Sequence, residues 1–444
     1  MVSDRPRLSG QETGPRSALT ARKQPVSALR DAGTYVVLLG SVTAGVGALV
    51  FQVVAGRSLG AESFAPISTI WTMLFLLNTI ALLPVEQYIT RELASSRVAS
   101  GRVLVLPVFL STFAAAGVVA WNFQAIFASD PVYLLLTGVL VASLALAARH
   151  RGQLAGTRSF TRYGVATIAQ TALLLLLGVA ASLWQAAAPA FVAALVVSPL
   201  AMLLVRVSPA ACSAVEVTDE TLPATPDGPA PTTTARFIGP YIVATASAQT
   251  LLAAAPVAVL FLGGSAEEIS VTFVVFTLLR APLTLLYAVQ ARLLPSMVTW
   301  AERGETQRLR RFAIRAAAVS VPAAALGAIG GAVAGPAVIA LLYGADFRPS
   351  ATVVSAVVAG VLFATAAQLV ALVIVARGAT TQLAVSWPAG LAAATLALFL
   401  VPGDAMTRVA IAFLVGQVVA LSLMTVLATR WPGRAAATTG AGRS

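Results

Sequence analysis

Long apolar runs limit what this sequence can fold into more than any other feature. The stretch from Thr171 to Leu183, TALLLLLGVAASL, carries no charged residue. Hydrophobic residues make up 58% of the 444 positions and charged residues only 10%, with a mean hydropathy of +0.87. A water-soluble globular domain is much less apolar than this. At about 20 residues per membrane-spanning helix, the chain has room for roughly a dozen spans.

The other membrane architecture, an outer-membrane β-barrel, needs strands in which apolar and polar residues alternate. The runs here are continuous, so we predict an all-α polytopic membrane protein. We expect about 12 transmembrane helices in two six-helix bundles around a central cavity. The helices are predicted at residues 34–56, 65–84, 103–125, 131–148, 163–184, 188–206, 238–262, 268–291, 313–342, 350–376, 382–402 and 406–428.

Polar segments divide the chain into five predicted parts. The longest segment between apolar runs is rich in Pro, Thr and Ala, a composition typical of a flexible linker. The predicted parts are an N-terminal cytoplasmic tail at 1–33, a first six-helix bundle at 34–207, a cytoplasmic linker at 208–237, a second six-helix bundle at 238–429 and a C-terminal cytoplasmic tail at 430–444.

The net charge of +12 would suggest a nucleic-acid partner in a soluble protein. Here the basic residues lie between apolar runs, where they report membrane orientation instead. With a cytoplasmic N-terminus, 25 of the 29 Lys and Arg residues fall on the cytoplasmic side. Three, Arg57, Arg348 and Arg408, fall in outer loops. We therefore predict a multi-pass inner-membrane protein with both termini in the cytoplasm, membrane lipids as partners and no nucleic acid.

The sequence contains few of the residue combinations that catalysis requires. One Cys (Cys212) and one His (His150) leave no disulfide, no metal-ligand cluster and no nucleophile–base pair. The outer loops are too short to carry a catalytic domain. We expect neither an enzyme nor a cofactor or metal.

Arg280 is the basic residue that lies deep within a predicted helix, about 20 Å from the outer end of that helix at 1.5 Å per residue. A charge at that depth costs at least ~2.5–3.5 kcal/mol. The nearby Pro282 removes a backbone donor and favours a kink that water or a ligand can reach. We expect Arg280 to face a cavity and bind an anionic group such as phosphate. The alternative is a structural arginine that binds carbonyls of neighbouring helices.

Uncharged polar residues within predicted helices are the other substrate-binding candidates. They are Gln52, Asn78, Gln249 and Gln368. Each has the groups to hydrogen-bond sugar hydroxyls, and each is equally suited to joining two helices.

The acids nearest the membrane, Glu86, Glu92, Glu267 and Glu268, are predicted at helix ends. Exporters of cationic drugs generally need an embedded carboxylate to bind and release an ion. A cavity with positive charge and no such carboxylate suits an anionic cargo.

One cytoplasmic segment, from Thr299 to Arg315, is both basic and aromatic. It is suited to forming a short interfacial helix with Trp300 and Phe312 near the lipid. The alternative is an ordinary basic loop that only marks the cytoplasmic side.

The stretch VAGRSLGAESFAPISTI resembles the R-x-LG-x-x-x-F signature near the start of polysaccharide and oligosaccharide flippases of the multidrug/oligosaccharidyl-lipid/polysaccharide exporter superfamily. Arg57, Leu59, Gly60 and Phe64 carry the signature, and Ala65 stands where those flippases usually have Gly. The segments YITRELA and RGQLAGTRSFTRYG are similar to the family's basic loop after helix 2 and to its segment between helices 4 and 5.

The resemblance implies a V-shaped pair of bundles that flips a polyprenyl-diphosphate-linked oligosaccharide or polysaccharide precursor across the membrane by alternating access. Polysaccharide assembly proteins would then be possible partners. Three alternatives stay open: a multidrug antiporter of the same superfamily, a membrane polymerase or glycosyltransferase of cell-surface polysaccharide, and a scaffold of an export complex.

Overall fold

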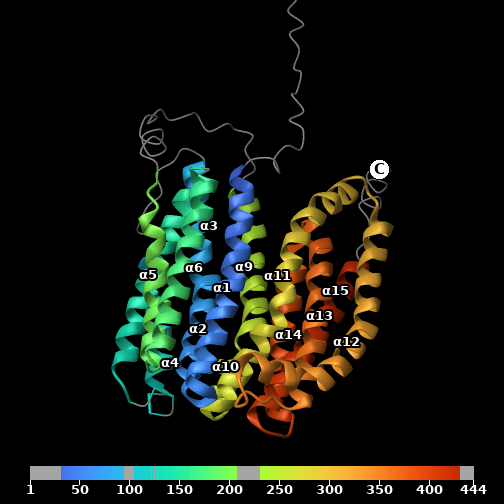
Figure 1. Ribbon diagram of the computed structural model, residues 1–444. Coiled ribbons are helices and arrows are strands. Elements are labelled where there is room, and N and C mark those ends of the chain that lie inside the picture. The colour runs from blue at the N-terminus through green and yellow to red at the C-terminus, as the bar shows by residue number, and fades with distance from the viewer. Residues whose placement is uncertain are drawn as a thin grey trace, which may run out of the picture.

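The structure is a computed structural model, and its described part is helical throughout, without a strand. The helices stand side by side with their long axes roughly parallel (Figure 1). The described residues are 32–94, 105–121, 123–124, 126–127, 129–157, 159–207 and 231–430.

The first half of the chain forms one group of helices. They are α1 (Ala32–Ser63), α2 (Ala65–Leu77) with its direct continuations η1 (Asn78–Leu82) and α3 (Leu83–Ala94), α4 (Val105–Trp121), α5 (Val132–Gly156), α6 (Phe160–Leu183), and α7 (Ala188–Val197) with its continuation η3 (Ser198–Leu204). The second half forms another group. They are α9 (Pro231–Ala253), α10 (Ala255–Phe261), α11 (Ala266–Glu302), α12 (Thr306–Tyr343), α13 (Ala351–Ala376), α14 (Thr380–Leu400) and α15 (Ala405–Arg430).

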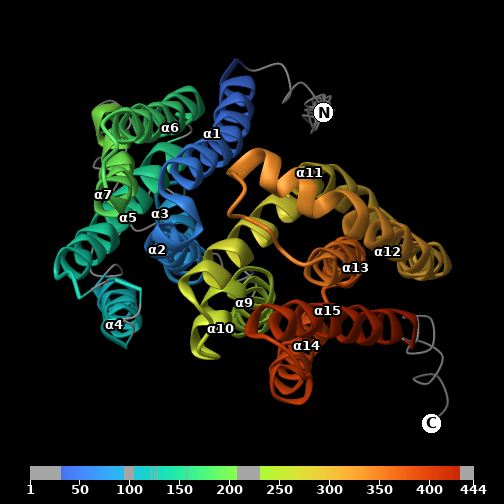
Figure 2. The same ribbon diagram turned by 60° about the horizontal axis from the view of Figure 1, so that its bottom comes forward.

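Each group packs mainly on itself. In the first, α1 lies along α6 and α3 along α5, and in the second α13 packs on both α12 and α15. Contacts between the groups come chiefly from α1 and α2 against α11 (Figure 2). A cavity between the groups would therefore lie beside these three helices.

The predicted fold class is confirmed, because the chain is an all-helical, polytopic membrane protein. Within the described residues, eight helices are long and apolar enough to cross a membrane, and nine if α9 and α10, bent by 70°, count as one span. Each of the twelve predicted runs overlaps one helix or a series of consecutive helices.

Several predicted boundaries were wrong. Helix α9 begins at Pro231, inside the predicted linker 208–237, and α5 continues through Gly156, well past the predicted end at 148. Helix α1 runs on to Ser63 and α15 begins at Ala405, so Arg57 and Arg408 lie in helices and not in outer loops. The predicted tails and the remaining linker, residues 1–31, 208–230 and 431–444, lie outside the described residues.

Glycines allow α1 and α6 to approach closely. A Cβ on Gly40 would lie 2.9 Å from the carbonyl oxygen of Gly164, and a Cβ on Gly164 would lie 2.5 Å from that of Val36. Backbone meets backbone at these points, so a larger residue would push the helices apart. Small residues serve this purpose in membrane proteins, where van der Waals packing drives helix association.

Arginines bind the carbonyl ends of neighbouring helices. The last carbonyls of a helix have no intrahelical donor, and a cation also interacts favourably with the helix dipole there. Arg377 Nη1 donates to Ala428 at the end of α15 at 2.6 Å, and Arg408 Nε donates to Leu398 near the end of α14 at 2.8 Å. These arginines stabilise helix ends as well as marking the predicted topology.

Candidate functional site

Arg57 joins the two groups of helices at one end of the molecule. Its Nε donates a 2.7 Å hydrogen bond to the carbonyl of Leu342, and its Nη2 donates to that of Leu341. Both carbonyls lie in the last turn of α12. This end is remote from the start of α1 at Ala32, so the topology prediction makes it the outer end (Figure 1).

Gly60 holds the backbone turn that follows Arg57. Its φ of 73° lies in the left-handed region, and it breaks the helical geometry of α1. A Cβ here would lie 3.1 Å from a carboxylate oxygen of Asp346, in the loop after α12. Glycine is therefore needed at this position both for its conformation and for the close approach of the second group.

Aromatic rings continue the contact inward from Arg57. Phe64 is fully buried and packs edge-on against Phe347, with ring centroids 5.9 Å apart. It also contacts Phe273 of α11 at 6.0 Å, and Phe273 in turn meets Trp71 of α2 at 6.4 Å. We call this set, with Arg57 and Gly60, the outer seam. Three of the four residues of the sequence signature, Arg57, Gly60 and Phe64, thus lie in the outer seam, and Leu59 packs beside them against the core.

Arg280 lies deeper along the same boundary. Its Nη1 donates to the carbonyl of Leu252 at 2.9 Å, and its guanidinium lies over the ring of Phe75 of the first group, 4.8 Å from the centroid. The carbonyl of Leu252 would normally accept from the backbone four residues on, but that residue is Pro256, which has no N–H. The α9–α10 bend thus exposes an acceptor that Arg280 binds.

The pocket around Arg280 is small and aromatic. Its volume of about 10 Å³ has room for little more than one water molecule. Both groups of helices contribute to its wall. The lining residues are Trp71, Thr72, Phe75, Ala253, Pro256, Phe273, Phe276, Thr277 and Arg280. A cargo would fit only if the two groups moved apart.

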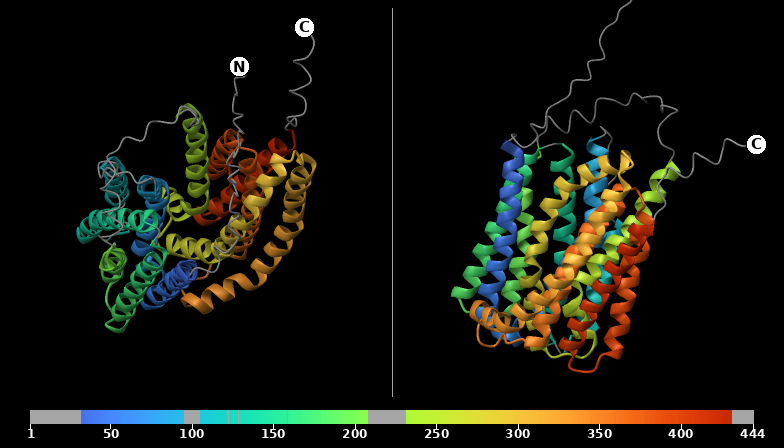
Figure 3. Two further views of the ribbon diagram at one scale, coloured as in Figure 1. Left: turned by 90° about the horizontal axis from the view of Figure 1, so that it is seen from above. Right: turned by 90° about the vertical axis from the view of Figure 1, so that its right-hand side faces the viewer.

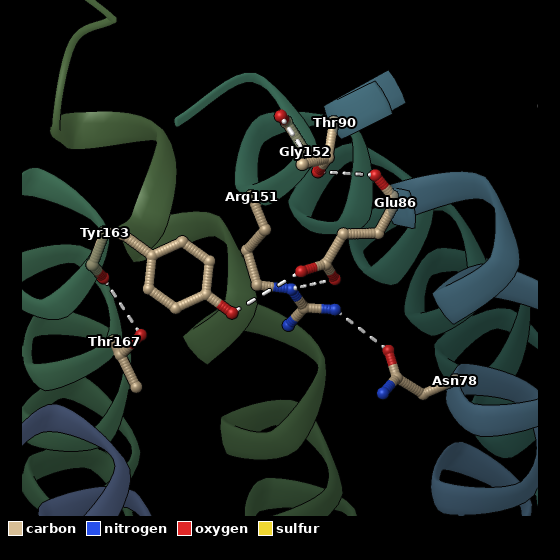
Figure 4. Close-up of polar contacts among 7 residues, drawn as sticks. All are labelled: Asn78, Glu86, Thr90, Arg151, Gly152, Tyr163 and Thr167. Atoms are coloured by element: carbon tan, nitrogen blue, oxygen red, sulfur yellow. Dashed lines mark hydrogen bonds and ion pairs between the residues drawn. The ribbon is translucent and has the colours of Figure 1, made fainter. Parts of the chain in front are cut away.

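A second polar cluster lies inside the first group, among α3, α5, α6 and η1 (Figure 4). Arg151 Nε donates to Glu86 Oε2 at 2.9 Å, and Arg151 Nη2 donates to Asn78 Oδ1 at 3.0 Å. The hydroxyl of Tyr163 donates to Glu86 Oε1 at 3.4 Å. Only 12% of the Glu86 side chain and 15% of the Arg151 side chain are exposed, so this is a largely buried ion pair.

The expectation that the acids near the membrane lie at helix ends was wrong for Glu86. Helices α2, η1 and α3 follow one another without a break, so Glu86 lies within a long helix and not at its end. The basic residue Arg151, which falls between the predicted helices at 131–148 and 163–184, lies in α5 beside it. Sequence spacing gave no signal for this pairing, because 65 positions separate the two residues.

The predicted substrate-binding residues do not share one site. Asn78 belongs to the Glu86 cluster, and neither it nor Gln52 nor Gln249 lines the pocket around Arg280. Gln52 is buried, and its Oε1 atom has no hydrogen-bond partner among the described residues, while Gln249 and Gln368 are half-buried. The side chains that line this pocket with Arg280 are instead mostly aromatic, and its other polar side chains are Thr72 and Thr277.

Comparison with solved structures identifies the fold. An inward-facing multidrug resistance MATE family transporter of the MOP superfamily aligns with a TM-score of 0.57 and 12% identity, over 89% of this chain and 96% of that chain. The MATE transporter VcmN of Vibrio cholerae aligns with a TM-score of 0.51 and 14% identity, over 91% and 97%. No protein-family model matches the sequence, and comparison with curated proteins finds no relative.

The chain therefore has the MATE transporter fold along nearly its whole length. Identities of 12 and 14% support the fold and leave the cargo open.

Proposed function

We propose that this protein is a membrane exporter that works by alternating access. The observation that carries the proposal is the outer seam, where Arg57, Phe64 and Phe273 join two groups of helices that each pack mainly on themselves. Two groups of helices that each pack mainly on themselves can change their relative position as units, and breaking the contacts of the outer seam would open the boundary at that end.

For the cargo, we propose an anionic amphiphile, with a polyprenyl-diphosphate-linked oligosaccharide as the specific class. Arg280 brings a guanidinium to the boundary between the groups, and a guanidinium binds a diphosphate through paired hydrogen bonds. When the groups separate, the diphosphate would replace the Leu252 carbonyl as acceptor. The aromatic faces beside it would stack on sugar rings, and the lipid tail would stay in the bilayer. Polysaccharide assembly proteins remain predicted partners of this cargo pathway.

The second candidate is a multidrug antiporter, and one observation favours it specifically. The Glu86–Arg151 pair supplies a largely buried carboxylate, which the sequence argument against an antiporter had assumed to be missing. Protonation of Glu86 would remove the charge that holds Arg151, a local change able to couple proton movement to a rearrangement of the first group. The fold of the two MATE transporters also suits this candidate.

Reconstitution in proteoliposomes separates the two candidates. One arm measures transfer of a fluorescent polyprenyl-diphosphate sugar between leaflets, and the other measures uptake of a cationic dye under a pH gradient. The anionic-cargo proposal expects transfer of the lipid-linked sugar, lost in Arg280→Gln, and no uptake of dye. Dye uptake that survives Arg280→Gln and is lost in Glu86→Gln would establish the antiporter instead.

A further inference from the structure

A second, larger pocket lies open at the turn between α11 and α12. Its volume is about 560 Å³, and its wall combines basic and aromatic side chains. Those that matter here are Trp300, Arg308, Arg311, Phe312 and Arg315. The pocket lies at the end of the molecule that carries the start of α1 and the end of α15, far from the outer seam (Figure 1).

Arg308 is held in place at this pocket. Its guanidinium lies over the ring of Trp300, 4.0 Å from the centroid, and its Nη1 donates to Glu305 Oε2 at 3.1 Å. Glu305 compensates one positive charge. Arg311 and Arg315 are exposed. Arg311 lies three residues after Arg308, and Arg315 four residues after Arg311, so all three lie on one face of α12.

The pocket lies at the level where helix meets lipid headgroup. The sequence of α12 carries its arginines in the first turns and becomes continuously uncharged from Ala316 onward. Trp300 and Phe312 are half-buried at this transition, the depth that aromatic side chains favour at a membrane surface. A phosphate at the membrane surface would therefore face all three guanidinium groups.

We propose that this pocket binds the phosphate of an anionic phospholipid in the leaflet at this end of the protein. Guanidinium groups bind phosphate oxygens through charge-assisted hydrogen bonds, and the volume exceeds that of a single headgroup phosphate, leaving room for the glycerol. An ordinary basic loop would attract anionic lipid without a pocket and without a fixed arginine. The proposal stands independently of which cargo the protein exports.

The test compares lipid binding by two charge-matched triple variants in a neutral detergent. The first is R308Q/R311Q/R315Q, which alters the pocket. The second, R303Q/R310Q/R430Q, removes three exposed arginines that do not line it. Native mass spectrometry would measure the affinity of each for phosphatidylglycerol, with phosphatidylcholine as the zwitterionic reference.

We expect phosphatidylglycerol to bind the wild type and the second variant equally, and the pocket variant about ten-fold more weakly, as the loss of charge-assisted contacts predicts. An equal loss in both variants, or no loss in either, would overturn the proposal in favour of general charge attraction. Melting temperatures in detergent without lipid establish that the variants fold, and the single variant Arg311→Gln, expected to show a smaller loss in the same direction, replaces the triple if it does not.

A competition arm identifies the source of the phosphate. A polyprenyl diphosphate is added to the protein saturated with phosphatidylglycerol. If equal concentrations displace little of the phospholipid, the pocket holds a bulk lipid as proposed. Displacement at a tenth of the phospholipid concentration would overturn that assignment and make the pocket an entry site for lipid-linked cargo.

Discussion

Arg57 on α1 donates a hydrogen bond to the carbonyl of Leu342, 285 positions later, and so ties the first group of helices to the last turn of α12. The contact joins a cation to the negative end of a helix dipole. Hydrogen bonds from charged donors contribute more to stability than those between neutral groups, and here they cross the boundary that the proposed alternating-access cycle would open.

We predict that Arg57→Ala shifts the protein toward a state with separated outer ends. The loss of two charge-assisted bonds at an exposed position should cost about 1–2 kcal/mol, or a population change of roughly 5- to 30-fold. Spin labels at residues 63 and 345, on the two sides of the outer seam, would report the change as a longer distance. Arg348→Ala is the matched control, because Arg348 is exposed at the same end. An unchanged distance distribution in Arg57→Ala would contradict the proposed role of the contact.

Gly60→Ala should weaken the outer seam by another route. Gly60 has φ 73° and ψ 171°, a conformation essentially restricted to glycine, so a residue with a Cβ there carries a strain of roughly 1–3 kcal/mol, and the added Cβ meets Asp346. The same spin-label pair should show separation, with a lower melting temperature. Gly304→Ala isolates the backbone effect, because Gly304 has φ 71° but a Cβ added there would have no atom within 4 Å. Separation of the outer ends in Gly304→Ala too would mean that strain anywhere in the chain produces the effect.

The ion pair between Glu86 and Arg151 should be costly to break. Glu86→Ala leaves a largely buried guanidinium without its carboxylate, and we expect a loss of about 3 kcal/mol in stability. The double variant Glu86→Ala with Arg151→Met should recover part of this loss, since the unpaired charge is gone. The exposed pair Glu305–Arg308 is the internal reference, and Glu305→Ala should cost under about 1 kcal/mol. Equal losses for the two glutamates, measured by thermal unfolding in detergent, would mean that Glu86 is as well solvated as Glu305.

Gly164→Leu should destabilise the packing of α1 on α6. The new side chain would meet the backbone of Val36, and overpacking of this kind costs about 1–3 kcal/mol. Gly45→Leu on α1 provides the control, because a Cβ there has no atom within 4 Å. We expect a lower melting temperature only for the first variant. Similar melting temperatures would show that the two helices can separate without loss.

Arg280→Ala should abolish transport of an anionic cargo. Arg280→Lys should retain part of the transport, because lysine keeps the positive charge but lacks the paired N–H donors of the guanidinium. A structural role is tested in a Pro256→Ala background, where residue 256 supplies the N–H that the Leu252 carbonyl lacks. If Arg280 serves only that carbonyl, Arg280→Ala in this background should regain both stability and transport. If Arg280→Ala in this background regains stability but not transport, the result supports a role of Arg280 in binding the cargo.

Composition and charge patterning predict the fold well because lipid imposes simple rules. A segment must be apolar and long enough to span, and its backbone must bond internally, so the twelve runs could be located without knowledge of tertiary contacts. Helix ends are harder to predict, because basic residues look like loop residues. Arg151 and Arg57 both lie inside helices, where a carboxylate 65 residues earlier and carbonyls at the end of α12 bind them.

The candidate site was predicted only in part, for a related reason. The depth of Arg280 could be derived from its position in the apolar run. Its partner could not, since the acceptor at Leu252 depends on a bend around Pro256 in another helix. In the sequence, three polar residues look alike, because each lies in an apolar helix. In the structure Gln52 is buried, Asn78 joins an ion pair and Gln249 is half-buried.

The length of α12 links the outer seam to the thickness of the bilayer. Its uncharged stretch, from Ala316 to Tyr343, is about 40 Å long at 1.5 Å per residue, whereas a hydrocarbon core measures about 30 Å. The helix, which contains Pro322 and Pro336, accommodates the excess by curving along the outside of its group (Figure 3). Lipids with longer acyl chains would relieve this hydrophobic mismatch and let α12 straighten, and shorter ones would tilt it further. Arg57 binds the last turn of that helix. A change in acyl-chain length would therefore change the strain on the contact that keeps the outer ends together.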